Sequence, residues 1–241
     1  MRSSEEGYAM PLGSSPYQEP PYPAGRNAEL LLAEFEADGV GMEYEVPDPL
    51  RFVKGTKPVA WIFDAPQRTG SVYHEGAVLL TVKYREVTGY YVPYIWGDND
   101  EAMFLNREVY GWPQLFCDHD ALHKDESAVW GLITRRGETL IKLSVLLERT
   151  AKPKELPLRE DWLQVRKFPN PLRGKPSIRH LIHTVVPAGT VHELWTGRAS
   201  LQLGPSAEFA LGRFGHVRAS RGFYMRTSFD LPLPIKAVKL P

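Results

Sequence analysis

Hydrophobic and polar positions alternate in short runs from residue 58 onward, which is the period of half-buried β-strands. Residues that are β-branched or aromatic fill these runs, and Gly, Pro, Asp or Asn residues separate them. The pattern predicts strands over residues 58–63, 77–86, 89–96, 178–186, 190–203 and 217–229. It also predicts a hairpin over 129–149, with its turn at Arg135-Arg136-Gly137-Glu138. The chain is therefore expected to be mainly β, of the α+β class.

Two short segments depart from this alternation and predict helices. Three consecutive leucines, Leu30 to Leu32, give a weak helical face and favour a short helix over 28–35. A second helix is predicted over 102–109, because Asp98 or Asn99 can cap its start and Gly111 can end it. A lone helix between strands indicates either a loop that positions functional residues or a simple crossover.

Residues 1–25 have the composition of an extended arm. They contain five prolines, three glycines and three tyrosines, with almost no aliphatic pattern. We expect residues 26–241 to form one domain. The arm is either free in solution or lies over a neighbouring surface, and its tyrosines favour the second. A homo-oligomer is expected on the same ground.

Composition limits the possible partners. The 241 residues carry 29 Lys and Arg against 29 Asp and Glu, so the excess of cations that nucleic-acid binding needs is missing. No apolar run approaches the roughly 18 residues of a membrane span. The first residues do not resemble a secretory signal, which favours a cytoplasmic protein. Cys117 is the only cysteine and excludes an internal disulfide.

Several motifs occur in a fixed order along the chain. They are Glu45-Val46-Pro47-Asp48-Pro49-Leu50, Tyr73-His74-Glu75, Gly89-Tyr90-Tyr91, Gly97-Asp98-Asn99-Asp100, Arg107-Glu108-Val109-Tyr110-Gly111-Trp112-Pro113, Val191-His192-Glu193-Leu194-Trp195-Thr196-Gly197 and Leu201-Gln202-Leu203. Together they resemble the acetoacetate decarboxylase family over about residues 28–230. The resemblance implies a closed or cone-like antiparallel β-barrel with a small-molecule cavity, short flanking helices and a symmetric oligomer.

The resemblance also implies Schiff-base chemistry, in which a lysine condenses with the substrate ketone after the aromatic-proline pair. Here Trp112-Pro113 is followed by Gln114 and Leu115, and no lysine lies between Arg107 and Lys124. An amide cannot form an imine. The sequence therefore departs from the family at its nucleophile.

At two more positions the sequence lacks a clear match to the polar pocket residues that the resemblance implies. Its second pocket glutamate falls near Ile62, an apolar residue, and its N-terminal arginine has Arg26 as the nearest candidate. We therefore expect Ile62 and Leu115 to contact a ligand that is more apolar than acetoacetate.

The resemblance places Glu75 at the position of an active-site carboxylate. In a cavity lined by Trp112, Tyr73 and Tyr110, desolvation would raise the pKa of Glu75 and make it a general acid or base. Gln114, Tyr73 and Tyr110 could then hydrogen-bond a developing enolate. The alternative is a loop glutamate in water.

Other candidates carry weaker chemistry. Arg107 and Glu108 could steer a substrate carboxylate, although a structural ion pair or capping network is the more ordinary role. Lys83 and Lys142 lie in predicted strands, and either would be reactive only if it faced inward.

A metal site is not expected. Residues Cys117-Asp118-His119-Asp120 and His123 supply ligand atoms, but no second pair with zinc spacing supports them. Cys117 is expected to be a buried structural thiol, and no cofactor is predicted.

These observations favour an enzyme of secondary or catabolic metabolism that acts on a keto, enol or enoyl compound by acid/base chemistry. Hydration, dehydration, cyclisation, isomerisation and decarboxylation all fit this set of side chains. The alternative is a non-catalytic protein that keeps the pocket and binds a small ligand.

Overall fold

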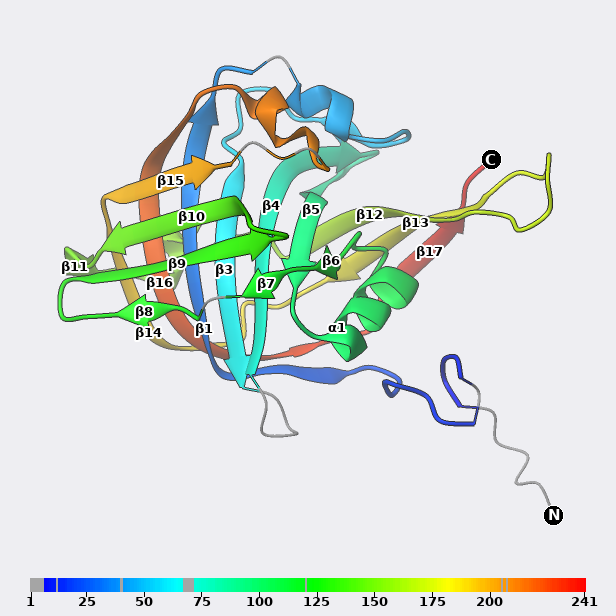
Figure 1. Cartoon of the computed structure of the whole chain (residues 1–241), viewed down its shortest axis with the longest axis horizontal. Helices are drawn as coiled ribbons and strands as arrows, with labels where there is room; N and C mark the ends of the chain where they lie inside the picture. Colours follow the sequence, from blue (N-terminus) through cyan, green and yellow to red (C-terminus); the bar gives the residue numbers. More distant parts are fainter. Residues whose placement is uncertain are drawn as a thin grey trace.

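The computed structural model describes residues 7–11, 13–39, 41–66, 72–119, 121–204, 206 and 208–241. They form a large and a small β-sheet (Figure 1). The large sheet runs in the order β11 (Arg149–Thr150), β14 (Thr190–Gly197), β16 (Val217–Leu231), β1 (Tyr22–Ala37), β3 (Val59–Pro66), β4 (Val72–Tyr84), β5 (Val87–Gly97), β12 (Asp161–Phe168), β13 (Ile178–Val185) and β17 (Lys236–Lys239). Two short strands extend it, β2 (Arg51–Phe52) on β4 and β6 (Leu115–Phe116) on β5.

The small sheet crosses in front of the large one in Figure 1. Its order is β15 (Ala199–Leu203), β10 (Glu138–Leu146), β9 (Ala128–Arg135) and β7 (Asp118–His119), and β8 (His123–Lys124) also pairs with β9. The prediction of a mainly β chain is confirmed. A closed barrel is not confirmed, because within the described residues the large sheet runs as an open path from β11 to β17 and the small sheet also stays open.

The alternating segments form strands where the sequence predicts them, except that the strand predicted over 190–203 is divided at Arg198 into β14 of the large sheet and β15 of the small sheet. The hairpin of β9 and β10 is confirmed, and its turn contains Arg136 and Gly137 at φ 51° and 79°. Strand β12 was not predicted, because a polar residue, Gln164, occupies a buried position in it and interrupts the apolar pattern.

The helix predicted over 28–35 is wrong, because these residues belong to β1. This strand pairs with β16 on one side and with β3 on the other. Leu31 faces one core cluster while Leu30 and Leu32 face the other, so all three leucines are buried. A strand covered on both faces reads as a continuous apolar run rather than as an alternation.

The large sheet has a core on each face. The intersheet core lies between the two sheets and includes Ile62, Val78 and Leu80 with Ile133 and Leu143 of the small sheet. The aromatic core lies on the opposite face and is rich in rings, namely Phe63, Tyr73, Tyr90, Tyr110, Trp112 and Trp162, with Trp61 packed against it. Alternation along each strand therefore decides which core a side chain joins.

The helix predicted before the Trp-Pro loop is present as α1 (Asp100–Leu105), followed by one π-helical turn, η2 (Asn106–Tyr110). Asn99 caps it, since its Oδ1 accepts a 2.8 Å hydrogen bond from the Ala102 N–H. Gly111 ends the helical segment in the left-handed region at φ 76°. A side chain there would also collide with β12, since its Cβ would lie 2.8 Å from the Cβ of Arg166.

Short 3₁₀ turns complete the described structure: η1 (Met42–Glu45), η3 (Pro153–Glu155) and η4 (Ala210–Phe214). In the described ranges, every helix is too short or too polar to cross a membrane. Within the predicted arm, Ala9 and Tyr17 are buried against the rest of the chain, and β1 already begins at Tyr22.

Candidate active site

Glu75 lies on β4 and faces the aromatic core. Its side chain is 6% exposed, and Tyr73 lies two residues away on the same face of the strand. Burial raises the pKa of the Glu75 carboxyl to about 7. The Tyr73 hydroxyl lowers this pKa in part, as does the Trp61 indole N–H, which approaches the carboxyl without reaching full hydrogen-bond geometry.

Glu75, Tyr73 and Gln114 form a row of hydrogen-bonded side chains. The Tyr73 hydroxyl contacts Glu75 Oε2 and lies 3.2 Å from Gln114 Oε1. Asn106 Nδ2 donates to the same Gln114 oxygen and so fixes the orientation of that amide. Gln114 Nε2 is consequently a buried donor that has no partner within the described part of the chain.

This row can accept or release one proton near neutral pH. With Glu75 ionised, the Tyr73 hydroxyl donates to the carboxylate; with Glu75 protonated, the carboxyl can donate to Tyr73, whose own proton then points to Gln114 Oε1. Both forms of Glu75 are populated around its pKa of about 7. A change of protonation state therefore needs only a rearrangement of hydroxyl protons.

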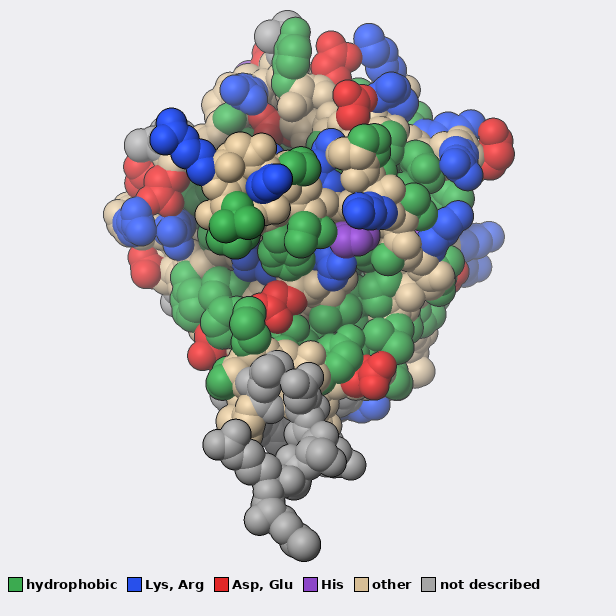
Figure 2. All heavy atoms as spheres, turned by 90° about the vertical axis from the view of Figure 1, so that its right-hand side faces the viewer, with side chains coloured by type: hydrophobic (Ala, Val, Ile, Leu, Met, Phe, Trp, Pro, Cys, Tyr) green, Lys and Arg blue, Asp and Glu red, His purple; other side chains and the backbone are tan. Residues whose placement is uncertain are grey.

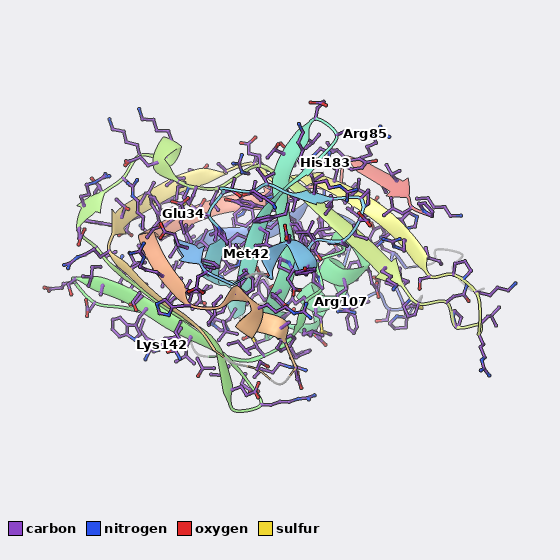
Figure 3. The ribbon with its side chains drawn as sticks, turned by 90° about the horizontal axis from the view of Figure 1, so that it is seen from above. Glu34, Met42, Arg85, Arg107, Lys142 and His183 are labelled. Carbon is purple, nitrogen blue, oxygen red and sulfur yellow. The ribbon has the colours of Figure 1, made fainter. Side chains whose placement is uncertain are left out.

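Backbone features hold Gln114 in place. Gly97 leaves the space for its amide, because a Cβ on Gly97 would lie 2.2 Å from Gln114 Nε2. Arg107 donates from Nη1 to the Gln114 carbonyl oxygen at 3.1 Å, and the rest of its side chain is exposed (Figure 3). Glu108 accepts a 2.5 Å hydrogen bond from the Tyr17 hydroxyl. Arg107 thus stabilises the loop that carries Gln114, and Glu108 binds Tyr17 of the N-terminal segment.

Aromatic rings surround this row. Trp162 on β12 contacts both Trp61 and Trp112, with ring centroids 5.4 Å apart in each pair. Tyr110 stacks on Trp112 at 4.8 Å. The Tyr110 hydroxyl donates to the Pro232 carbonyl oxygen at 3.0 Å, so the structure brings its ring to the site but not its hydroxyl.

Ile62 and Leu115 lie on the other side of the sheet from Glu75. Ile62 is fully buried in the intersheet core, where a Cβ on Gly131 would lie 3.4 Å from its Cδ1. Leu115 packs against the same core. The structure does not bring either residue to the candidate site, because successive side chains of a strand face opposite sides and the neighbouring Trp61 is the one that reaches Glu75.

All eleven lysines of the chain are exposed. Lys83 lies 3.6 Å from Glu86 at the end of β4. Lys142 lies on the outer side of the small sheet, across the view from Arg107 (Figure 3). Arg26 pairs with Asp230 at 2.7 Å on the surface. These cations therefore do not approach Glu75.

Cys117 is buried in the intersheet core, and burial raises the pKa of its thiol to about 12. The thiol is therefore protonated at neutral pH and unsuited to nucleophilic attack. Asp120 lies outside the described residues. The rest of the described chain contains no group of three His, Cys, Asp or Glu residues that could hold a metal ion.

An open groove of about 520 Å³ adjoins the Trp112 loop. Its lining residues are Tyr8, Met10, Tyr17, Glu108, Val109, Arg166 and Phe168. Figure 2 shows the side of the molecule that carries α1 and the C-terminus, and hydrophobic side chains gather on it. Since Arg166 also contacts Gly111, next to Trp112, the groove borders the loop that leads to Gln114.

Two residues of this site are not predicted by the sequence. Asn106 lies in the π-helical turn, and Trp61 lies on the face opposite to the expected Ile62.

A β-rich fold with one buried carboxyl of near-neutral pKa beside a phenol and an amide is typical of small-molecule enzymes that transfer protons. The family model described as acetoacetate decarboxylase matches residues 9–237, and the chain belongs to this family.

Individual relatives agree with this assignment. An acetoacetate decarboxylase of Clostridium beijerinckii is 30% identical over 211 residues, which cover 79% of each chain. A solved acetoacetate decarboxylase structure has a TM-score of 0.87 at 22% identity, over 100% of this chain and 98% of that one. The enduracididine biosynthesis enzyme MppR has a TM-score of 0.79 at 16% identity, over 99% and 96%. At these identities the two structural comparisons show the fold.

Proposed function

We propose that this protein is an enzyme that moves protons on a small keto, enol or enoyl compound, with Glu75 as its general acid and base and without a Schiff base. The observation that carries the proposal is the buried Glu75 carboxyl, whose pKa lies at about 7 and which contacts the Tyr73 hydroxyl. A group with a pKa near the working pH donates and accepts protons most efficiently.

The neighbouring side chains supply the second half of such a reaction. When a base removes a proton from the carbon next to a carbonyl, negative charge develops on the carbonyl oxygen. The buried Gln114 Nε2 donor and the Tyr73 hydroxyl are suited to hold that oxygen. Dehydration, hydration, cyclisation, isomerisation and decarboxylation of an activated β-keto acid all share this proton transfer.

The exposure of the lysines supports chemistry without an imine. A reactive lysine needs desolvation or a nearby cation to favour its free amine, and the exposed Lys83 and Lys142 lack the first. Borohydride reduction in the presence of acetoacetate is therefore expected to leave the protein mass unchanged. A covalent adduct on any lysine would overturn this part of the proposal.

The relatives support a carbonyl substrate. Two names in this family and fold contain a small keto acid: acetoacetate in the decarboxylase of Clostridium beijerinckii, and pyruvate in a complex of MppR. Both compounds have a carbonyl next to a carbon that can gain or lose a proton. For this protein we propose only the shared feature, a carbonyl group next to such a carbon, and neither of the two named compounds.

The test is exchange of the methyl hydrogens of acetophenone and 4-hydroxyacetophenone in D₂O, followed by ¹H NMR. The wild-type protein is expected to accelerate exchange, and Glu75→Gln is expected to lower the rate by about 100-fold or more, as for loss of a general base. Glu126→Gln, an exposed glutamate, is the matched control and should leave the rate unchanged. Equal rates for wild type and Glu75→Gln would refute the proposal.

A ligand-binding protein without catalysis is the second candidate, and the close packing of Trp61, Trp112 and Trp162 is the observation that favours it. It predicts that the probes bind while the wild-type protein accelerates no exchange. A cytoplasmic location, a role in secondary metabolism and a homo-oligomeric state remain predictions.

A further inference from the structure

Gln164 on β12 has a buried side-chain amide that forms no hydrogen bond within the described residues. Its side chain is 2% exposed, and neither Nε2 nor Oε1 has a partner within the described residues. Leaving a buried donor or acceptor unpaired costs about 1–3 kcal/mol, so folded proteins rarely keep two such atoms in one side chain. A bound molecule that supplies both partners would remove this cost.

The strand geometry fixes the side to which Gln164 points. Residues 162, 164 and 166 share one face of β12, while Leu163 on the opposite face packs with Leu181. Trp162 contacts Trp112, and the Cβ of Arg166 approaches Gly111. Gln164 lies between these two contacts and therefore faces the Trp112 loop.

This loop side is also the side of Glu75. Trp162 contacts Trp61, with their ring centroids 5.4 Å apart, and the Trp61 indole in turn borders the Glu75 carboxyl. Gln114 Nε2 and Trp112 Nε1 are further buried donors without partners in the described chain. The unpaired polar atoms of Trp112, Gln114 and Gln164 thus all lie on the side of the large sheet that carries the aromatic core.

The side chains near Gln164 include one cation. The buried polar residues in the described ranges include two carboxylates but no Lys, Arg or His. Arg166 is only partly buried: one of its amino groups donates to the Glu108 carbonyl oxygen, and its Nε is buried without a partner in the described chain. The amide of Gln164 itself is neutral and is matched best by a ligand group that both donates and accepts a hydrogen bond.

We propose that Gln164 is a substrate-specificity residue that selects a flat compound bearing both a carbonyl and a hydroxyl group. A hydroxyl both donates and accepts, and so satisfies the oxygen and the nitrogen of one amide together. The Gln114 and Trp112 donors suit the carbonyl oxygen, and the indole rings suit a planar skeleton. The proposal rests on the proposed function, because it assigns the substrate class of the same site.

The test measures binding by calorimetry with three probes of similar shape: 4-hydroxyacetophenone, 4-methoxyacetophenone and 4-acetylbenzoate. Wild type is expected to bind the hydroxy compound at least about 10-fold more tightly than the methoxy compound, which lacks the donor. The carboxylate probe also lacks a donor and should likewise bind more weakly than the hydroxy compound. Gln164→Met should remove the preference between the hydroxy and methoxy probes, and Gln202→Met, an exposed glutamine, should keep it.

The wild-type preference is measured without any variant, so a folding defect of Gln164→Met leaves the proposal testable. It is overturned if wild type binds none of the probes, if it does not discriminate between the hydroxy and methoxy compounds, or if Gln164→Met keeps the discrimination. The last result would mean that the amide is structural and satisfied by water.

Failure of the proposed function gives a different signature. Selective binding of the probes without catalysed hydrogen exchange would refute the proposed enzymatic function but would leave the specificity role of Gln164 intact.

Discussion

The pH dependence of stability tests the environment of Glu75 without any knowledge of the substrate. The pKa of this carboxyl is raised from 4.5 to about 7 by burial. Between these two values the folded protein binds more protons at this site than the unfolded chain does. Glu75 therefore destabilises the fold progressively as the pH rises from about 4.5 to about 7, and its effect then stays constant.

The magnitude follows from the size of the shift. Each pKa unit corresponds to about 1.4 kcal/mol, so the shift from 4.5 to about 7 gives a full effect of about 3 kcal/mol. Some 2 kcal/mol of this should already be present by about pH 6. Because Glu75 is buried, solvent screening does not reduce this effect appreciably.

Glu75→Gln replaces the titrating group with a neutral amide of the same size. The free energy of unfolding, measured by urea titration with tryptophan fluorescence, should rise relative to wild type by about 3 kcal/mol between pH 4.5 and 8. Only the change of this difference with pH matters, since the amide itself adds a constant offset. A difference that stays flat with pH would refute a raised pKa at Glu75, and Glu126→Gln is the control.

Two further predictions address the frame around Glu75. Gly97→Ala would place a Cβ 2.2 Å from Gln114 Nε2, so the amide must shift. The rate of hydrogen exchange in acetophenone should fall at least about 10-fold, while the circular dichroism spectrum stays that of wild type. An unchanged exchange rate would contradict the role given to Gln114. Leu32→Ala removes a fully buried side chain of β1 and should lower the free energy of unfolding by about 2–5 kcal/mol; a loss below 1 kcal/mol in urea titration would contradict its central place in the sheet.

The sequence predicted the half-buried strands because their side chains alternate between core and solvent. It could not predict β1 as a strand, since burial on both faces turns the alternation into a run of leucines. It also missed β12, where Gln164 occupies a buried position. The partners of β1 also lie far away in the sequence, whereas β12 pairs with the next strand, β13, so for β12 the interrupted apolar pattern is the cause.

The site was predicted in part, through resemblance rather than through pattern. The motifs placed Glu75, Tyr73, Gln114 and Trp112 in one region, and the structure brings these four side chains into the aromatic core or its border. Ile62 was chosen instead of its neighbour Trp61, because a shift of one residue in a strand reverses the face. Asn106 contacts Gln114 only because a π-helical turn presents it, which no local pattern indicates.

The identity of residue 114 and the raised pKa of Glu75 have one physical cause in common. A cation within about 4–6 Å of a carboxyl favours its ionised form and lowers its pKa, whereas burial alone raises it. The neutral amide of Gln114 gives no such compensation, and the described lysines are all exposed, so burial decides the pKa of Glu75. In the proposed function, the absence of imine chemistry and the acid/base role of Glu75 therefore both depend on the neutral amide at position 114.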